Sequence, residues 1–285
     1  MEPRKSNALS RELGDALRQA RRRSSVRFGN LAEELGWSPA RISKVERGLR
    51  GTPALDIARY VGHLRADRAT YDHIMSLAEE RNTGHLVRPH EIAMPDGLRA
   101  LLLHEQTAKV IWSYEVTVIP GLLQTADYAG ALIDVTSGDH RVAGRMARQR
   151  IFDRPQSPEG RFFILESALH HVVGGPQVMY EQMLQLLFRG GVRLVTFACQ
   201  LPTALASAFA FMTFADHQPV SYVETGPLSV FSDEPETTAH FEQACNDLDR
   251  VALSEEQSRS VFAKWADRYD RLREEQRGAG GEAVA

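Results

Sequence analysis

The segment from Leu31 to Gly48 constrains the fold most, because its residues favour two short helices joined by a tight turn. Leu31 and Leu35 lie four residues apart and therefore share one helical face. The small Ala32 stands beside them and leaves room for a second helix to cross closely. Gly36 suits the left-handed conformation that ends a helix without Cβ strain. The first helix is therefore predicted to end at this glycine.

A second helix is predicted to begin almost at once. Ser38 is a preferred N-cap residue, and Pro39 at the first helical position loses no N–H that the helix needs. Ile42 and Val45 lie three residues apart and are expected to pack against the first helix. An end and a start this close together force a sharp angle, which is the helix-turn-helix arrangement. Two amphipathic helices around a glycine also occur in domains that never touch DNA. Here the small residue, glycine, N-cap and anchors all stand at the required offsets, which favours DNA binding.

The charge of the chain is unevenly distributed. The 285 residues carry a net charge of −3, but residues 1–88 hold 17 Lys and Arg against 11 Asp and Glu. The other 197 residues hold 17 Lys and Arg against 26 Asp and Glu, so the N-terminal part is basic and the C-terminal part is acidic. We therefore expect the N-terminal part alone to bind DNA.

The composition is that of an ordinary globular protein, with 43% hydrophobic and 25% charged residues. No run of about 18 apolar residues is present, so we expect no membrane helix. The opening MEPRKSNALSREL lacks the apolar core of a secretory signal. Cys199 and Cys245 lie far apart and indicate neither a disulfide framework nor a zinc site. We expect a cytoplasmic protein with no cofactor, no metal and no membrane contact.

Hydrophobic spacing divides the chain into two folded regions, which predicts an α+β protein. Residues 1–81 are expected to form an all-α domain of five helices. Residues 82–97, with two Pro and two Gly, are predicted to be a linker. Residues 98–273 are expected to form an α+β effector or partner-binding domain with a small sheet, and residues 274–285 a disordered tail. Its predicted strands are Val116–Ile119, Arg161–Glu166, Val192–Ala198, Phe209–Ala215 and Val220–Glu224, and its first helix is Leu98–Tyr114.

The N-terminal region resembles the Xre family, the phage-repressor-like helix-turn-helix proteins. The matching residues are Leu31, Ala32, Gly36, Ser38, Ile42, Ser43, Glu46 and Gly48. The resemblance also implies a salt bridge from the first helix to the end of the recognition helix, at the positions of Arg21 and Glu46.

The remainder resembles the C-terminal domain of actinobacterial regulators of the WhiJ-like type. The stretches that carry the likeness are VIPGLLQTADYAGALI, RMARQR, VGGPQVMYEQM and LSEEQSRSVF. Such regulators are often encoded beside short proteins, so the resemblance also supports an antitoxin-like role. In that role the C-terminal domain would neutralise a small protein encoded next door.

The chain departs from the Xre pattern at the residues that usually contact DNA. Phe28 stands where the family usually has a phosphate-binding Gln, and Pro39 and Ala40 replace base-reading amides. We therefore expect Arg41, Lys44 and Ser43 to contact bases, with a guanine in the half-site, and Ala40 to contact a thymine methyl. We assign phosphate contacts to Arg27, Arg47 and Arg50.

A single domain of this size makes few DNA contacts, so we expect a homodimer on double-stranded DNA with half-sites one helical turn apart. The C-terminal domain is expected to provide the dimer contact and to bind a small protein partner or a small-molecule effector. The function that the residues favour is that of a transcription regulator. The alternatives are the antitoxin-like regulator and an enzyme tethered to DNA.

The enzyme alternative rests on incomplete motifs. His104-Glu105 is followed by Ala108 where a zinc protease needs a second histidine, and His170-His171 is poor ligand spacing on a helix. Glu166 and Glu224 lie at predicted strand ends, where carboxylates are mostly solvated. We therefore expect no catalytic residues.

Overall fold

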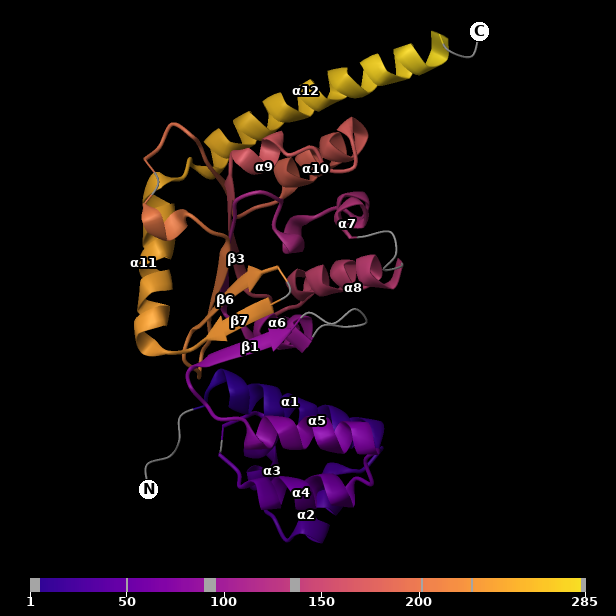
Figure 1. The fold of residues 1–285 in the computed structure, drawn as a ribbon, viewed down its shortest axis with the longest axis vertical. Coiled ribbons are helices and arrows are strands. Elements are labelled where there is room, and N and C mark those ends of the chain that lie inside the picture. The colour runs from indigo at the N-terminus through magenta and orange to yellow at the C-terminus, as the bar shows by residue number, and fades with distance from the viewer. Residues whose placement is uncertain are drawn as a thin grey trace.

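The computed structural model describes residues 6–49, 51–89, 96–133, 139–200, 202–226 and 228–282. The N-terminal region is helical, with α1 (Ala8–Arg23), α2 (Phe28–Leu35), α3 (Pro39–Glu46), α4 (Ala54–His63) and α5 (Arg68–Glu79). These helices enclose their own core, which includes Leu17, Leu31, Ile42, Ile57 and Tyr60, all fully buried. They lie together at the lower end of the molecule in Figure 1.

The described strands of the remaining chain form one mixed sheet in the order β1-β7-β6-β5-β2-β3-β4. Their bounds are β1 (His85–Pro89), β2 (Val110–Glu115), β3 (Glu159–Leu165), β4 (Val192–Val195), β5 (Phe209–Thr213), β6 (Val220–Thr225) and β7 (Leu228–Ser232). The pairs from β1 to β2 are antiparallel, and β2, β3 and β4 run parallel to one another. The fold class predicted from the sequence, an all-α region followed by an α+β region, is confirmed.

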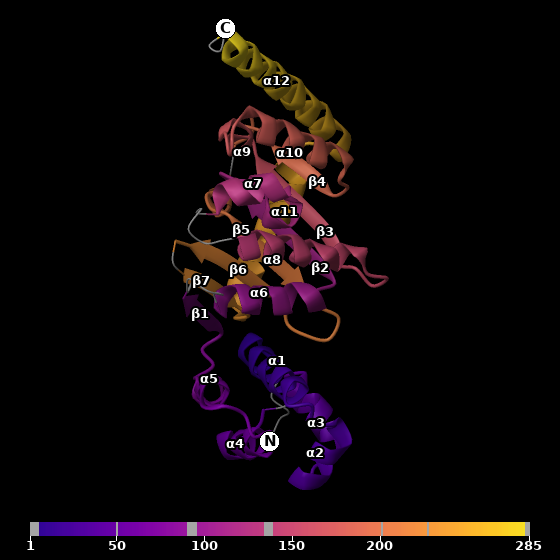
Figure 2. The same ribbon diagram turned by 90° about the vertical axis from the view of Figure 1, so that its right-hand side faces the viewer.

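Helices cover both faces of the sheet. One face is covered by α11 (Pro235–Val251), at the left of the strands in Figure 1, and the other by α6 (Asp96–Thr107) and α8 (Asp139–Gln149). Figure 2 shows these last two helices in front of the strands. The short η1 (Gly121–Leu123), α7 (Ala126–Leu132), η3 (Arg150–Asp153), α9 (Ser167–His170) and η4 (Thr203–Leu205) complete the connections. Finally, α10 (Pro176–Phe188) packs along α12 (Glu255–Glu282), which also contacts β4.

The predicted helix over Leu98–Tyr114 is wrong beyond Thr107, because β2 occupies Val110–Glu115. Trp112 packs in the core beneath α11, whereas Ile111 packs in the core of the opposite face. A strand buried on both faces has a continuous apolar sequence, and periodicity cannot separate such a run from a buried helix. The predicted strand at Val116–Ile119 is consequently wrong as well, since β2 has ended by then.

Two further segments differ from the prediction. His85–Pro89, inside the predicted linker, form the edge strand β1, which pairs with β7. The last helix continues to Glu282, past residue 273, where the sequence suggested a disordered tail. Glu, Gln and Arg propagate a helix well once a packed segment has nucleated it. Arg273 and Arg277 also donate hydrogen bonds to Gln177 of α10.

The helical region and the sheet share a buried junction. Arg88 of β1 forms ion pairs with Glu12 of α1, at 2.6 Å, and with Glu80 at the end of α5, at 2.9 Å. Leu9 of α1 and Leu86 of β1 belong to the same apolar core as the sheet. Pairing of β1 with β7 therefore fixes the helical region against the rest of the molecule.

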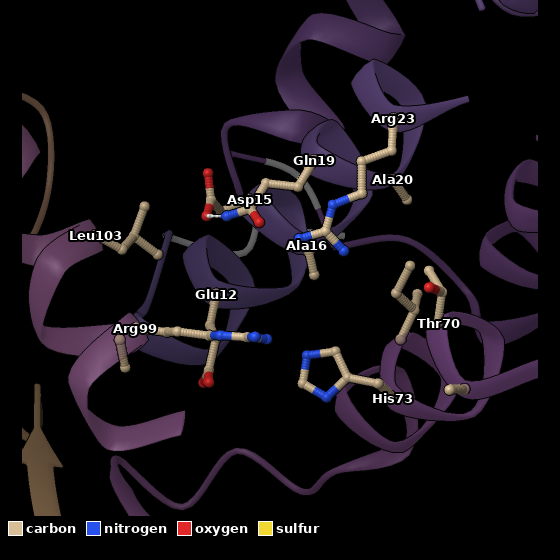
Figure 3. A pocket seen from close by; sticks show the side chains of 13 residues that line it. Glu12, Asp15, Ala16, Gln19, Ala20, Arg23, Thr70, His73, Arg99 and Leu103 are labelled. Carbon is tan, nitrogen blue, oxygen red and sulfur yellow. Dashed lines mark hydrogen bonds between the residues drawn. The ribbon is translucent and has the colours of Figure 1, made fainter. Parts of the chain in front are cut away.

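A groove of about 230 Å³ lies beside this junction, between α1, α5 and α6. Figure 3 shows Glu12 and Asp15 of α1, His73 of α5, and Arg99 of α6 around it. Leu103 of α6 lines the same groove. The helix α6 thus has one side next to α1 of the helical region.

Candidate nucleic-acid interface and sheet-face cavity

The turn between α2 and α3 has the geometry that its residues favour. Gly36 has φ 65° and ψ 31°, the left-handed conformation that closes α2. The hydroxyl of Ser38 accepts a hydrogen bond from the Arg41 N–H at 3.2 Å and caps α3. Leu31 and Ile42 are fully buried, and Ala32 and Val45 are nearly so. The four side chains therefore fix the angle between the two helices.

The helix α3 also lies in close contact with α1. A Cβ atom built on Gly14 of α1 would lie 2.7 Å from the Val45 carbonyl oxygen and 2.8 Å from that of Glu46. Contacts this short do not occur, so only glycine allows the two backbones to approach in this way. Gly48, with φ 65°, ends the segment against the start of α1.

A buried ion pair holds the C-terminal end of α3. Arg21 of α1 donates to both carboxylate oxygens of Glu46, at 2.6 and 2.9 Å, as the family resemblance implies. The Tyr60 hydroxyl of α4 donates to the same carboxylate at 2.5 Å, and burial raises the pKa of Tyr60. Three helices are thus joined at Glu46, which leaves the opposite side of α3 as its outer face.

The outer face of α3 carries most of the residues to which the sequence assigns DNA contacts. Ala40, Lys44 and Arg47 are exposed and Ser43 is half-buried. Arg27 is exposed at the N-cap of α2. Arg50 lies outside the described residues. The described part of the chain therefore presents a small basic surface on α3 and the start of α2.

Arg41 differs from the other predicted base contacts. Its guanidinium forms an ion pair with Asp56 of α4 at 2.6 Å and lies 3.9 Å from the centre of the Trp37 ring. Phe28, which occupies the position of the usual phosphate-binding Gln, lies under the guanidinium of Arg21 and against the helical core. The aromatic side chain therefore packs inward, and Arg27 is the exposed basic residue there.

A second feature is a cavity of about 400 Å³ on the sheet face that α6 and α8 cover. Its floor is a row of cross-strand neighbours, because Ser113 of β2 pairs with Ala210 of β5, which pairs with Tyr222 of β6. Glu115 and Glu224 lie further along β2 and β6, and line the same cavity. The walls come from α6, η1, the residue Gln124, α7 and α8.

The polar groups of this cavity are ordered by hydrogen bonds from one another. Arg148 of α8 forms a two-pronged ion pair with Glu105 of α6. Arg145, one turn earlier, donates to the side-chain oxygen of Gln124 at 2.7 Å, and the Gln124 amide donates to the Ile119 carbonyl. The Tyr222 hydroxyl donates to Glu224 at 2.8 Å.

Glu115 is the exception in this network. Among the described residues the structure gives its carboxyl group no hydrogen bond and no ion pair. Burial, followed by the charge of Glu224, raises the pKa of Glu115 to about 7, against the opposing effect of Arg148 and Arg145. A carboxyl group of this kind changes its charge near neutral pH and faces an open space.

The catalytic candidates considered from the sequence do not lie together. Glu166 accepts a hydrogen bond from the Phe197 N–H at 2.8 Å, which joins the end of β3 to the segment after β4. His104 is fully buried between aromatic rings, and His170 packs against Trp265. Glu224 is the one that lines the cavity. Within the described ranges, no three His, Cys, Asp or Glu side chains are placed to hold a metal ion.

Sequence reasoning missed the residues that give the cavity its charge, namely Glu115, Tyr222, Arg145 and Arg148. A signal for the two arginines was present, since RMARQR places them three apart on one helical face. Glu115 was missed because β2 was expected to be helical, so this residue was not seen as a strand end.

No helix of the described residues is long and apolar enough to cross a membrane. The comparisons with known proteins found no match among curated proteins and no match among solved structures. Two domain families match. Residues 12–74 match a family described as a helix-turn-helix domain, and residues 98–264 match a domain of unknown function, DUF5753. Because the second match covers more than half of the chain, the protein belongs to the DUF5753 family and carries a helix-turn-helix domain in front of that domain.

Proposed function

We propose that this protein is a sequence-specific transcription regulator of the Xre type that acts on DNA in the cytoplasm. The observation that supports this most is the recognition helix α3, whose inner face is fixed to α1 and α4 while its outer face presents exposed basic residues. A rigid helix with basic residues on its outer face is what major-groove readout requires.

In this proposal Lys44, Ser43 and Ala40 contact base edges, and Arg27, Arg47 and Arg50 contact phosphates. Arg41 reaches a base only by exchanging its ion pair with Asp56 for DNA. The energy of the lost ion pair offsets part of the gain. We therefore assign Lys44 a larger share of base recognition than Arg41.

We further propose that the protein binds as a homodimer through its C-terminal domain, because one helix-turn-helix domain makes few contacts. Among the described residues of that domain, Val172, Phe188, Phe197 and Leu272 are large apolar side chains with exposed surface. Burial of such side chains is the usual source of subunit association.

The C-terminal domain is proposed to be a non-catalytic effector domain, like that of the WhiJ-like regulators it resembles. The cavity on the sheet face supports a small-molecule effector. A small protein that co-purifies with the chain and leaves this cavity empty would instead support the antitoxin-like role.

Selection of the full chain against random double-stranded DNA tests the proposal. The expected result is an enriched near-palindrome whose half-sites contain guanine and lie about one helical turn apart. Light scattering of the complex should show two copies of the chain. Recovery of no enriched sequence would contradict sequence-specific binding, and a single copy on a single half-site would contradict the dimer.

A further inference from the structure

We infer that the cavity on the sheet face binds a small organic monocation, a protonated amine that also carries a neutral hydrogen-bond acceptor. Glu115 and Glu224 take the cationic nitrogen, and Arg145 takes the acceptor. This inference deepens the effector role proposed above and rests on it for its regulatory consequence, though not for the binding itself.

The space fits a molecule of this class. A cavity of about 400 Å³ lies in the range that holds small ligands, about 300–1,000 Å³. Apolar surface comes from residues such as Leu101, Leu122 and Phe209, and the charged groups come from β2, β6, α6 and α8. A ligand with an apolar ring and polar groups attached to it would therefore find apolar as well as polar contacts.

The charges in the cavity define the charge of the ligand. With their carboxyl groups ionised, Glu105, Glu115 and Glu224 supply three negative charges, against two positive charges from Arg145 and Arg148. Arg148 is committed to Glu105 through two hydrogen bonds. Counted over these five described residues, the ionised cavity has one more negative charge than positive, and a proton on Glu115 or a monocationic ligand restores the balance. Glu115 is half-buried, so ionising it without a counter-charge is unfavourable, whereas Glu224 has exposed surface.

The hydrogen bonds define where the ligand groups lie. The Glu115 carboxyl group has no partner among the described residues, so it has acceptor sites for an ammonium group. Among the described residues Arg145 donates through Nη1 to Gln124, and its other N–H groups meet no acceptor there, so they can serve a ligand. Gln124 is committed on both sides and holds Arg145 in place.

The cavity is connected to the helix-turn-helix domain by α6. Leu101 and Glu105 of this helix line the cavity, whereas Arg99 and Leu103 line the groove against α1 (Figure 3). A ligand that pulls Arg148 or Glu105 would therefore act on a helix that contacts the DNA-binding region. This placement is the physical route by which binding would alter DNA affinity.

Calorimetry on the full chain without DNA tests the ligand class. Three probes share one ring and one amide: para-(aminomethyl)benzamide is a cation, para-(hydroxymethyl)benzamide is neutral and para-carbamoylbenzoate is an anion. The cation is expected to bind at least about tenfold more tightly than either of the others. Equal binding of all three, or no binding of the cation, would overturn the inference.

Two variants locate the site. Glu115→Gln keeps the shape of the side chain and should lower the affinity for the cation by at least about tenfold. Arg145→Met should lower that affinity by a smaller factor. Glu242→Gln, an exposed glutamate on α11 at the opposite face of the sheet, should leave affinity unchanged. If Glu115→Gln fails to fold, the Arg145 variant and the probe series still decide. Unchanged affinity in both cavity variants would contradict the assignment.

The pH dependence gives an independent readout. Among the described residues, the titratable and charged groups around Glu115 are Glu224 and Tyr222 from β6, Arg145 and Arg148 from α8, Glu105 from α6 and Tyr128 from α7. Since the proton on Glu115 competes with the ligand, affinity for the cation should rise from about pH 6 to about pH 8. Glu115→Gln should remove that rise. A failure of the binding experiments would leave the result of the DNA selection unchanged. The proposed cation site and the proposed DNA-binding function can therefore be contradicted separately.

Discussion

Arg11 and Arg88 are both buried in the junction, but their surroundings differ. Arg88 pairs with Glu12 and Glu80, whereas in the described residues no hydrogen-bond acceptor meets the guanidinium nitrogens of Arg11. The Arg11 side chain lies 4.9 Å from the centre of the Phe214 ring, and burial lowers its pKa to about 10. It therefore remains charged at neutral pH, and among the described residues its guanidinium has the charge of Asp233 nearby but no hydrogen-bond acceptor.

Methionine substitutions at these two arginines should consequently have opposite effects. Arg88→Met removes a buried guanidinium, leaves two partly buried carboxylates unpaired and should cost up to about 3–5 kcal/mol of unfolding free energy. Arg11→Met removes a buried charge that has no hydrogen-bond partner among the described residues and should be neutral or stabilising. Equilibrium unfolding in urea measures both. Equal losses for the two variants would show that Arg11 has a partner that these contacts do not reveal.

His104 should make stability depend on pH. Burial, then the charges of Arg11 and His217, lower the pKa of His104 well below its ordinary value of 6.5. The unfolded chain therefore takes up a proton below about pH 6.5 while the folded chain does not, so stability falls as the pH falls. The loss from this residue should approach about 1.4 kcal/mol per pH unit.

Unfolding measured between about pH 7 and pH 5.5 tests this sign. His104→Phe should flatten the dependence, and the exposed control His240→Gln should keep the wild-type slope. A slope that is the same in all three proteins would mean that His104 is protonated, or accessible to water, in the folded state.

At the scale of elements, the contact between α1 and α3 depends on the absence of one side chain. Gly14→Ala would place a methyl group 2.7 Å from a backbone oxygen of α3 and should destabilise the helical region by about 1–3 kcal/mol. Gly29→Ala is the matched control, because nothing lies within 4 Å of its Cβ position in α2. It should be neutral or stabilise by up to about 1 kcal/mol.

Thermal unfolding and DNA affinity should both separate these two glycine variants. Gly14→Ala should lower both the melting temperature and the affinity for DNA, since the recognition helix is no longer held at its angle. An unchanged Gly14→Ala protein would mean that α1 and α3 can move apart without cost.

The elements that could be predicted are those with local signals. The N-cap Ser38 and the turn glycine Gly36 specify α2 and α3 through contacts within a few residues, and α10 follows from Pro176 and its apolar period. The strand β2 could not be separated from a helix, because both of its faces are buried. The strand β1 is formed by pairing with β7, more than a hundred residues away, and no local pattern reports that.

At the scale of the whole molecule, the same limit applies to the cavity. Glu115, Tyr222 and Arg145 come together only because the sheet order places β6 two strands from β2 and α8 above them. Their positions in the sequence do not predict that these three side chains lie close together. The helix-turn-helix site, in contrast, lies on one short segment, and its charged face follows from helical periodicity alone.

In the molecule as a whole, the sheet, α6 and α1 are continuous in their packing. DNA recognition nevertheless depends on one exposed face of α3. A base contact and a phosphate contact on that face should therefore behave differently when the DNA sequence is changed.

The most direct test is the affinity of Lys44→Ala for the selected DNA site and for a shuffled site of the same composition. The account predicts a loss of about 1–3 kcal/mol on the selected site and little loss on the shuffled one. Arg27→Ala should lose affinity on both and should lower the salt dependence by about one ion. Lys264→Ala, an exposed control on α12, should change neither. Equal losses of Lys44→Ala on both sites, or no loss at all, would contradict base recognition by α3.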